Sequence, residues 1–364
     1  MFSPFDSQYM ARALRLAEQG LYSTSPNPRV GCVLVRDEKI VGTGCHQRAG
    51  EAHAEVLALR AAGEAARGAT AYVTLEPCSY FGRTPPCADA LIAAGVARVV
   101  VAMQDPNPLV AGKGIAKLRA AGISVASGLM EAAARELNLG FVSRMTRGLP
   151  YVRSKIASSL DGRTALKNGV SQWVTGAEAR RDVQHWRARS CAVLTGINTI
   201  LADDAQLNVR DIATTRQPLR VVLDSQLRMP LDAKILLGSN TLIYTAAQNS
   251  EKISALEKLG VSVCVLANAQ GRVDLSAMLK DLAQRGINEV LVEAGSVLNG
   301  ALLQENLIDE LVLYLAPQML GDAARGMANL GELTQLDQRV ELHWQDVRQV
   351  GNDLRVQAKI CRVG

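Results

Sequence analysis

Strand-like and helix-like segments alternate along this chain of 364 residues, and the alternation begins again near its middle. In the first part, apolar β-branched runs predict strands at residues 30–35, 40–45, 70–74, 99–102 and 123–126. Ala- and Leu-rich segments between them predict helices at residues 53–63, 87–95 and 114–122. Such alternation requires a sheet covered by helices on both faces, which should be parallel after an initial antiparallel hairpin.

The second part repeats the α/β pattern after a linker expected at residues 146–150. Strands are predicted at residues 151–157, 192–195, 219–223, 241–244, 261–266 and 289–292, with helical segments between several of them. The tail predicts further strands without helices at residues 311–316, 340–347 and 354–360. We therefore expect two α/β domains, residues 1–145 and 150–364, the second with an antiparallel ending.

Composition narrows the class of protein. Seven cysteines, an odd number scattered along a large chain, argue against a disulfide framework and favour a reducing cytoplasm. No apolar run is long enough to span a bilayer, and the first 20 residues predict an amphipathic helix, not a secretion signal. The net charge of +5 is dispersed, so it does not separate phosphorylated small molecules from nucleic acid as partners.

The strongest chemical signal is His53-Ala-Glu55, followed by Pro77-Cys78 and then Cys87. One imidazole and two thiolates are good zinc ligands, and three ligands leave the fourth position for a reactive water. Glu55 is better suited to carrying protons than to binding metal. This residue set is typical of the zinc nucleobase deaminases, in which the glutamate is not a ligand.

Two alternatives stay open at this point. The spacing between Cys78 and Cys87 is longer than the usual Pro-Cys-x-x-Cys, which is compatible with a structural zinc site. A structural site needs four protein ligands, however, and no fourth cysteine or histidine lies nearby at ligand spacing. A deaminase of bases in RNA should carry a basic, aromatic surface, whereas this chain is 4% aromatic and has no basic stripe.

Four longer motifs carry a more specific resemblance. They are Pro-Asn-Pro-Arg-Val-Gly-Cys at residues 26–32, Gly-Cys-His-Gln-Arg-Ala-Gly-Glu-Ala-His-Ala-Glu at 44–55, Thr-Leu-Glu-Pro-Cys-Ser-Tyr-Phe-Gly-Arg-Thr-Pro-Pro-Cys at 74–87, and Gln-Asp-Pro-Asn-Pro at 104–108. Together they closely resemble the bifunctional deaminase–reductases of bacterial riboflavin biosynthesis, and the longer Cys-to-Cys spacing is that family's own pattern.

The resemblance implies an α/β protein with an N-terminal cytidine-deaminase-like three-layer α/β/α domain and a C-terminal dihydrofolate-reductase-like domain. The first domain would use Zn²⁺ to remove the 2-amino group of a diamino-ribosylamino-pyrimidinone 5′-phosphate. The second would use NADPH to reduce the ribosyl group to a ribityl chain. The implied partners are this small phosphorylated substrate and further copies of the chain, as a dimer or tetramer, with no nucleic acid or membrane.

Matched positions assign His53, Cys78 and Cys87 to zinc and Glu55 to proton transfer. Asn27, His46 and Arg83 would contact the first substrate. The sequence departs from the family at Tyr80, where members often have histidine, so any contact made by that histidine is in doubt here.

In the second domain, the matched positions that would contact NADPH are Ala157, Trp173, Thr199, Asp203, Ser225 and the turn Gly295, Ser296, Val297, Leu298, Asn299, Gly300 and Ala301. The matched positions that would line the substrate side are Ser171, Arg187, Leu207, Arg210 and Glu293. Lys155 and Asp203 would assist hydride transfer. Without the resemblance, the small-residue turn is only a weak anion-binding signal, because it is not Gly-x-Gly-x-x-Gly. A non-catalytic dimerisation or ligand-sensing role for this domain therefore stays open.

Overall fold

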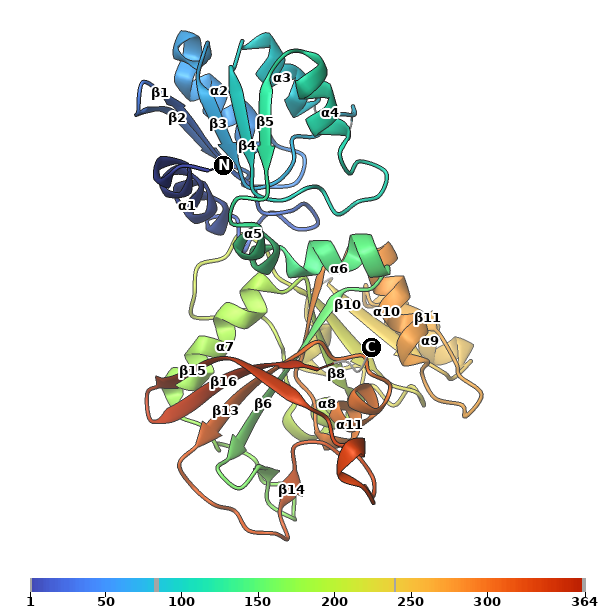
Figure 1. Ribbon diagram of the computed structural model, residues 1–364. Coiled ribbons are helices and arrows are strands. Elements are labelled where there is room, and N and C mark those ends of the chain that lie inside the picture. The colour runs from blue at the N-terminus through green and yellow to red at the C-terminus, as the bar shows by residue number, and fades with distance from the viewer. Residues whose placement is uncertain (1, 82–84, 239, 362–364) are drawn as a thin grey trace. The chain divides into compact units, whose positions relative to one another are not determined.

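The computed structural model describes residues 2–81, 85–238 and 240–361, and the chain divides into two compact units, Met1–Leu149 and Pro150–Gly364 (Figure 1). Each unit contains its own sheet, so the α/β class predicted for both parts is confirmed. Within the described residues, no helix is both long enough and apolar enough to cross a membrane.

The first unit is built on a five-stranded sheet in the order β2-β1-β3-β4-β5. The strands are β1 (Gly31–Arg36), β2 (Lys39–Cys45), β3 (Thr70–Val73), β4 (Arg98–Val101) and β5 (Ser124–Ser127). Strand β1 pairs antiparallel with β2 and β3, whereas β3, β4 and β5 are parallel. The predicted hairpin followed by parallel strands is therefore confirmed.

Its helices are α1 (Pro4–Glu18), α2 (Ala54–Ala62), α3 (Cys87–Ala93), α4 (Lys113–Ala120), α5 (Glu131–Leu137) and α6 (Leu139–Arg147), with the short 3-10 helix η1 (Gly63–Ala66). Helices α5 and α6 were not predicted. Because α6 continues to Arg147, the first two residues of the expected linker are helical, and residues 148–150 make the connection to the second unit.

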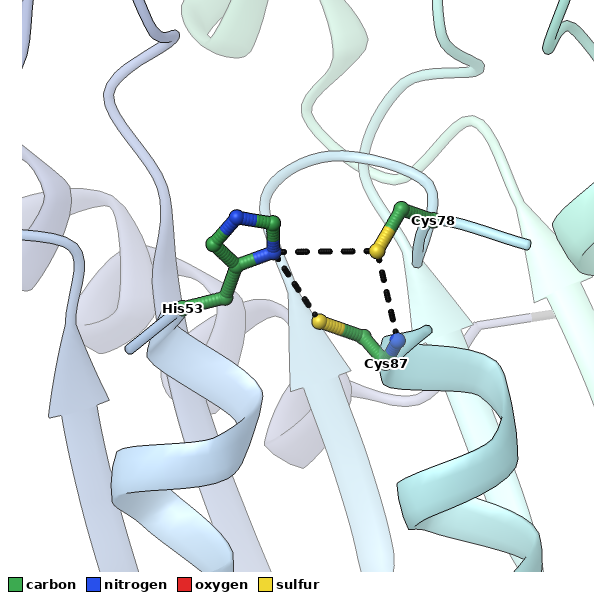
Figure 2. Close-up of side chains that lie close together, drawn as sticks. All are labelled: His53, Cys78 and Cys87. Atoms are coloured by element: carbon green, nitrogen blue, oxygen red, sulfur yellow. Dashed lines mark hydrogen bonds between the residues drawn. The ribbon is translucent and has the colours of Figure 1, made fainter. Parts of the chain in front are cut away.

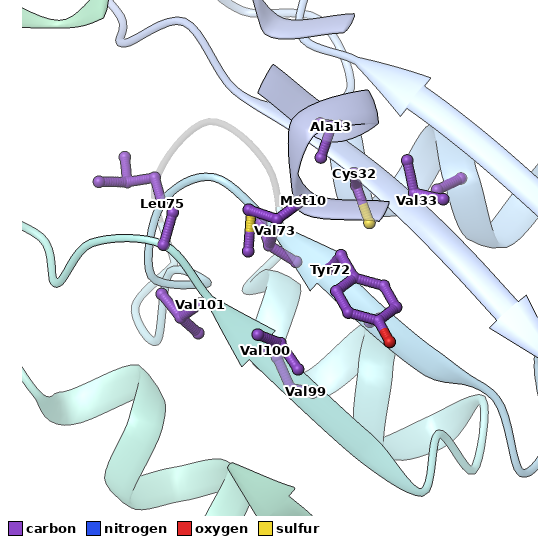
Figure 3. Packing of buried hydrophobic residues seen from close by; sticks show 14 of the residues in the cluster. Met10, Ala13, Cys32, Val33, Tyr72, Val73, Leu75, Val99, Val100 and Val101 are labelled. Atoms are coloured by element: carbon purple, nitrogen blue, oxygen red, sulfur yellow. The ribbon is translucent and has the colours of Figure 1, made fainter. Parts of the chain in front are cut away.

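Glycines on the sheet allow the helices that frame the site to approach closely. A Cβ at Gly42 would lie 2.3 Å from the Ala58 carbonyl oxygen, and one at Gly44 would lie 2.2 Å from that of Ala54. Side chains there would push α2 away from β2, so these glycines set how closely α2 packs on the sheet. The valines of β3 and β4 fill the core with Met10 and Ala13 of α1 (Figure 3).

The second unit has a nine-stranded sheet in the order β11-β10-β9-β8-β12-β6-β13-β16-β15. Its strands are β6 (Tyr151–Ser159), β8 (Ala192–Gly196), β9 (Leu219–Leu223), β10 (Thr241–Thr245), β11 (Ser262–Val265), β12 (Glu289–Val292), β13 (Glu310–Ala316), β15 (Leu342–Val350) and β16 (Asp353–Ile360). The pairings from β11 to β13 are parallel, and those of β16 with β13 and β15 are antiparallel, as predicted for the tail.

The remaining elements of this unit connect or cover that sheet. They are α7 (Ala177–Arg189), α8 (Ile197–Asp203), α9 (Ser250–Lys258), α10 (Leu275–Gln284), α11 (Ser296–Gln304), the strand pair β7 (Arg163–Ala165) and β14 (Arg325–Gly326), and the 3-10 helices η2 (Lys234–Leu236) and η3 (Leu336–Gln338).

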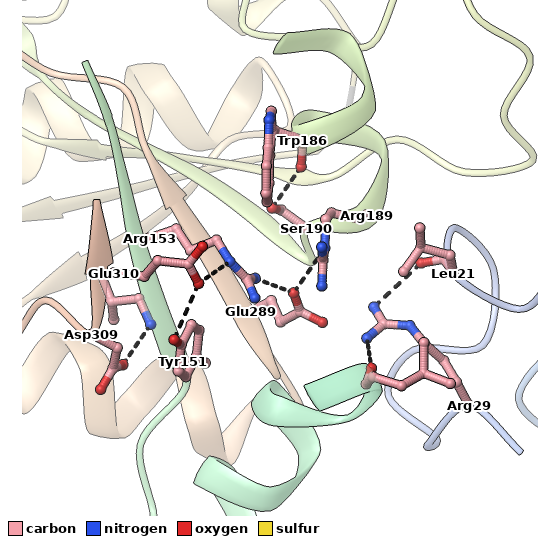
Figure 4. A network of polar contacts seen from close by, with 12 residues as sticks. Leu21, Arg29, Tyr151, Arg153, Trp186, Arg189, Ser190, Glu289, Asp309 and Glu310 are labelled. Atoms are coloured by element: carbon pink, nitrogen blue, oxygen red, sulfur yellow. Dashed lines mark hydrogen bonds and ion pairs between the residues drawn. The ribbon is translucent and has the colours of Figure 1, made fainter. Parts of the chain in front are cut away.

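A buried polar network closes the amino edge of the parallel strands (Figure 4). The Arg153 guanidinium, almost completely buried, pairs with Glu289 and, at 2.9 Å, with Glu310. The Tyr151 hydroxyl donates to the same Glu310 carboxylate at 3.1 Å. Because Glu289 and Glu310 begin β12 and β13, this edge is occupied by paired charges, and the carboxyl edge is left for ligands.

Candidate functional site

Three side chains with metal-ligand chemistry converge in the first unit (Figure 2). His53 is the N-cap of α2, and Cys87 is the first residue of α3. The His53 Nδ1 atom lies 3.2 Å from the Cys87 Sγ and 3.6 Å from the Cys78 Sγ. Nitrogen and sulfur ligands of one tetrahedral zinc ion lie about 3.6 Å apart at usual bond lengths, so the cluster fits zinc.

The electrostatics of the cluster favour a bound cation. The hydrogen bond with Cys87 lowers the pKa of the Cys78 thiol to about 4, and the Cys87 backbone N–H also donates to the Cys78 Sγ at 3.2 Å. The same side-chain contact, together with burial, raises the pKa of Cys87. The hydrogen bond to Cys78 raises the pKa of His53. Without a metal, Cys87 therefore keeps its proton while Cys78 is the thiolate. A divalent cation would allow both residues to bind as thiolates.

Glu55 lies beside this cluster without belonging to it. It occupies the first turn of α2 and is 4% exposed, while the three residues whose ligand atoms converge are His53, Cys78 and Cys87. Burial and the nearby Cys78 raise the pKa of Glu55 to about 7. A buried carboxyl group beside the metal position can both accept and return a proton.

Two of the three predicted contacts to the first substrate meet at this site. His46 is 2% exposed, its ring packs edge-on to that of His53 at 5.3 Å, and its Nδ1 lies 3.1 Å from the Ala52 carbonyl oxygen. Burial lowers the pKa of His46. Asn27 Nδ2 lies 3.0 Å from Nε2, and because an amide nitrogen can only donate, the ring proton is assigned to Nδ1. Arg83 lies outside the described residues.

Sequence reasoning missed Glu76, two residues before Cys78. Its carboxylate accepts four backbone N–H bonds of 2.8–3.1 Å, which come from Asp105, Gly112, Gly114 and Ile115. These bonds fix the 105–115 segment against the backbone that carries Cys78. A buried acidic residue at the end of an apolar strand was the available signal.

A second cluster lies at the carboxyl edge of the larger sheet. Glu293 follows β12, and its carboxylate receives Arg187 Nε at 2.6 Å and Arg187 Nη2 at 3.0 Å. The Lys155 ammonium lies 3.8 Å from the same carboxylate. Burial opposes the charge of Glu293, but Arg187 and Lys155 outweigh it and lower the pKa of the carboxyl group to about 2. Burial lowers the pKa of Lys155.

Apart from Trp173 and Asp203, the positions predicted to contact NADPH follow neighbouring strands along this edge. Ala157 is on β6, Thr199 follows β8 in α8, Ser225 follows β9, and the segment 295–301, which begins α11, follows β12. The strand order β9-β8-β12-β6 makes these four strands consecutive. Ligands of open α/β sheets bind outside the carboxyl ends of the strands, where this row lies.

The segment 295–301, predicted as a small-residue turn, is helical from Ser296 onward, with Gly295 as the N-cap of α11, and it has an inner and an outer side. Asn299 is buried, accepting from the Ser154 hydroxyl at 3.0 Å and donating to the Ala294 and Met327 carbonyl oxygens at 3.2 Å. A Cβ at Gly300 would lie 2.1 Å from the Asn329 carbonyl oxygen. These two positions hold the start of α11 in place, whereas Gly295 and Val297 face solvent and Ser296, Leu298 and Ala301 are half-buried.

The other predicted reductase residues are more dispersed. Asp203 is exposed at the end of α8 and accepts a hydrogen bond from Gln172 Nε2 at 3.4 Å. Ser171, the residue before Gln172, is half-buried. Trp173 is 68% exposed, with the Arg180 guanidinium 4.5 Å from its ring centre.

Leu207 and Arg210 lie in the segment that follows α8. Leu207 is buried, whereas Arg210 is exposed and its charge helps to lower the pKa of Glu293. The Arg210 charge therefore acts on the Glu293 carboxyl group, and Leu207 belongs to the neighbouring core.

Family models match both units. Residues 3–103 match the cytidine and deoxycytidylate deaminase zinc-binding region, and residues 150–356 match the RibD C-terminal domain. The second match argues against a non-catalytic role for the C-terminal unit. With the ligand cluster, the two matches confirm the predicted cofactors, zinc and NADPH.

Whole-chain relatives agree. The riboflavin biosynthesis protein RibD of Escherichia coli is 50% identical over 96% of this chain and 98% of its own length, and that of Haemophilus influenzae is 45% identical over 98% and 97%. The solved structure of Acinetobacter baumannii RibD has a TM-score of 0.93 at 49% identity and covers 98% of this chain and 99% of its own. The chain belongs to the RibD family, the bifunctional deaminase–reductases of riboflavin biosynthesis.

Proposed function

We propose that this chain deaminates a diamino-ribosylamino-pyrimidinone 5′-phosphate and then reduces the ribosyl group of the product with NADPH. A Thermotoga maritima structure is named for a deaminase and a reductase of these phosphoribosylaminopyrimidines. It is 32% identical, with a TM-score of 0.87, and covers 98% of this chain. The same two reactions in the same order are proposed here.

The observation that carries the first reaction is the convergence of His53, Cys78 and Cys87 beside a buried Glu55. When bound there, zinc supplies a water whose pKa is lowered toward neutrality. Glu55 takes a proton from the attacking water and delivers it to the amino group that leaves as ammonia. Asn27 and His46 hold the pyrimidine ring, and we assign Arg83 to the substrate phosphate.

In the second reaction, bound NADPH would supply a hydride to the sugar C1. The bond from C1 to the ring oxygen breaks, and that oxygen needs a proton. Lys155 is a suitable donor because burial lowers its pKa, and Asp203 is the second candidate. Arg187 and Glu293 hold the Lys155 ammonium in position through the ion pairs of the cluster.

We further propose a cytoplasmic homo-oligomer. All seven cysteines are free thiols, which suits a reducing compartment. On the terminal β15–β16 hairpin, Trp344, Val347 and Leu354 are 61%, 58% and 41% exposed. Apolar side chains gathered at the end of a sheet support a contact with a second copy.

Product masses test the two reactions. The purified protein is incubated with the diaminopyrimidinone nucleotide, with and without NADPH. We expect the deaminated nucleotide alone without NADPH, and a deaminated and reduced nucleotide with it. Deamination that NADPH does not extend would contradict the second reaction. No mass change with zinc present would contradict the substrate.

A further inference from the structure

At the carboxyl edge of the large sheet, Arg228 has no acidic partner in the part of the chain that the structure describes. Arg228 lies in the segment after β9, and its Nη2 donates to Asn198 Oδ1 at 2.8 Å. It is exposed, and no carboxylate is paired with it among the described residues. Arg187, at the same edge, is by contrast occupied by Glu293.

Arg228 is presented by a firmly held turn. The buried Asp224 carboxylate accepts the Met229 backbone N–H at 2.7 Å, and its carbonyl oxygen accepts the Leu227 N–H at 2.9 Å. Leu227 and Met229 are 5% and 0% exposed, so the residues on both sides of Arg228 are anchored in the core. A guanidinium held this way loses little freedom when it binds an anion.

The strand order indicates which end of NADPH lies near which strand. The charged cluster of Lys155, Glu293 and Arg187 lies at β6 and β12, so hydride transfer and the nicotinamide belong at that end. The row of predicted NADPH contacts ends at Ser225, beyond β9, three strands away from β6. Three strand spacings are about 14 Å, which places the adenosine end of the dinucleotide beside Ser225 and Arg228.

The polar groups around Arg228 suit an anion. Ser225 Oγ already accepts the Val273 N–H at 3.1 Å, so its hydroxyl proton is directed to another acceptor. Asn198 uses its oxygen on Arg228, and its amide N–H groups have no hydrogen-bond acceptor among the described residues, so they can donate to a ligand. A phosphate next to these three residues would receive an arginine fork, a hydroxyl and an amide.

We propose that Arg228, supported by Asn198 and Ser225, binds the 2′-phosphate of NADPH and sets the preference over NADH. The assignment rests on the proposed reductase function. Among the described arginines, the competing candidate is Arg272, which is exposed and adjoins Val273 next to Ser225.

Binding of two fragments isolates the 2′-phosphate. Affinities of 2′,5′-ADP and 5′-AMP are measured by calorimetry on the full-length protein, for wild type, Arg228→Gln, Arg272→Gln and Arg119→Gln. Arg119 is the matched control, because it is also exposed and donates to a neutral oxygen, that of Val125. We expect Arg228→Gln to weaken 2′,5′-ADP at least about tenfold, leaving 5′-AMP and the unfolding temperature unchanged.

The outcomes separate the two proposals. A preference for 2′,5′-ADP that survives in Arg228→Gln, or that is lost in Arg272→Gln instead, overturns the assignment. Arg228→Lys, which keeps the charge but not the fork, should recover part of the affinity. If wild type binds neither NADPH nor either fragment, the NADPH-dependent reduction itself is wrong.

Discussion

The two sites differ in what holds their charged groups together. In the first unit, the ligand atoms of His53, Cys78 and Cys87 converge within 4.8 Å of one another, and this group of three includes no lysine or arginine. In the second, the Glu293 carboxylate is clamped by Arg187 and Lys155 from the same fold. The first cluster would therefore need an ion from solution to balance two thiolates, whereas the charges of the second are balanced by the chain itself.

The largest separation should come from His53→Ala. Removing one of three ligands should reduce zinc from a full equivalent to almost none and abolish deamination, while reduction of the deaminated nucleotide continues. Metal analysis and both product assays check this. His343→Ala, an exposed histidine of β15, serves as control and should leave both unchanged. Retained zinc in His53→Ala would contradict the ligand set.

Glu55→Gln tests metal binding and proton transfer separately within the first site. The ligands are untouched, so zinc content should stay at one equivalent, while deamination should fall about 10²–10⁴-fold because the proton carrier is lost. Glu64→Gln, an exposed position of η1, is the matched control. Normal turnover by Glu55→Gln would show that another group moves the proton.

Glu293→Gln tests the balance of charge in the second site. It leaves Arg187 and Lys155 facing each other without their carboxylate, which should lower the free energy of unfolding of this unit by about 3 kcal/mol. The Glu341→Gln control breaks an exposed pair with Arg339 at 3.5 Å and should cost at most about 1 kcal/mol. Denaturant melts of both variants make the comparison, with zinc content unchanged. Equal denaturation midpoints for the two variants would contradict a stabilising role for the Glu293 ion pairs.

Lowering the pH should have the smallest effect on the second site and should separate the loss of zinc from the protonation of Glu293. The pKa of Glu293 is lowered from 4.5 to about 2, so its contribution to stability is complete above pH 4.5 and is lost as the pH falls toward 2. Zinc ligands compete with protons, so metal should leave the first site while Glu293 is still ionised. Carboxyl carbon NMR of Glu293 alongside zinc release tests this order. Titration of Glu293 near its ordinary pKa would contradict the predicted order.

The same contrast explains what the sequence could predict. His53 and Cys87 lie 34 residues apart in a recognisable motif at two helix starts, so chemistry and spacing were sufficient. Arg187 and Glu293 are 106 residues apart and meet only through the strand order, so they were predicted by resemblance alone. The roles of Asn299 and Gly300 as inner supports of their turn likewise depend on contacts that the sequence does not display.

Helices α5 and α6 escaped prediction for a related reason. The helical pattern is interrupted at Asn138, whose side chain accepts the Arg29 backbone N–H at 2.8 Å and donates to the Arg29 carbonyl oxygen at 3.0 Å. Glu76 was missed because its four partners are backbone N–H groups 29 to 39 residues further along the chain. Periodicity does not report tertiary hydrogen bonds of this kind.

The most direct test of two sites with different requirements uses zinc-depleted, full-length protein with NADPH. The diamino nucleotide and the already deaminated nucleotide are supplied separately, and product masses are recorded. We expect the first to remain unchanged and the second to gain the two hydrogens of reduction, with added zinc restoring deamination. Deamination by the zinc-free protein, or failure to reduce the deaminated nucleotide until zinc is returned, would contradict the account.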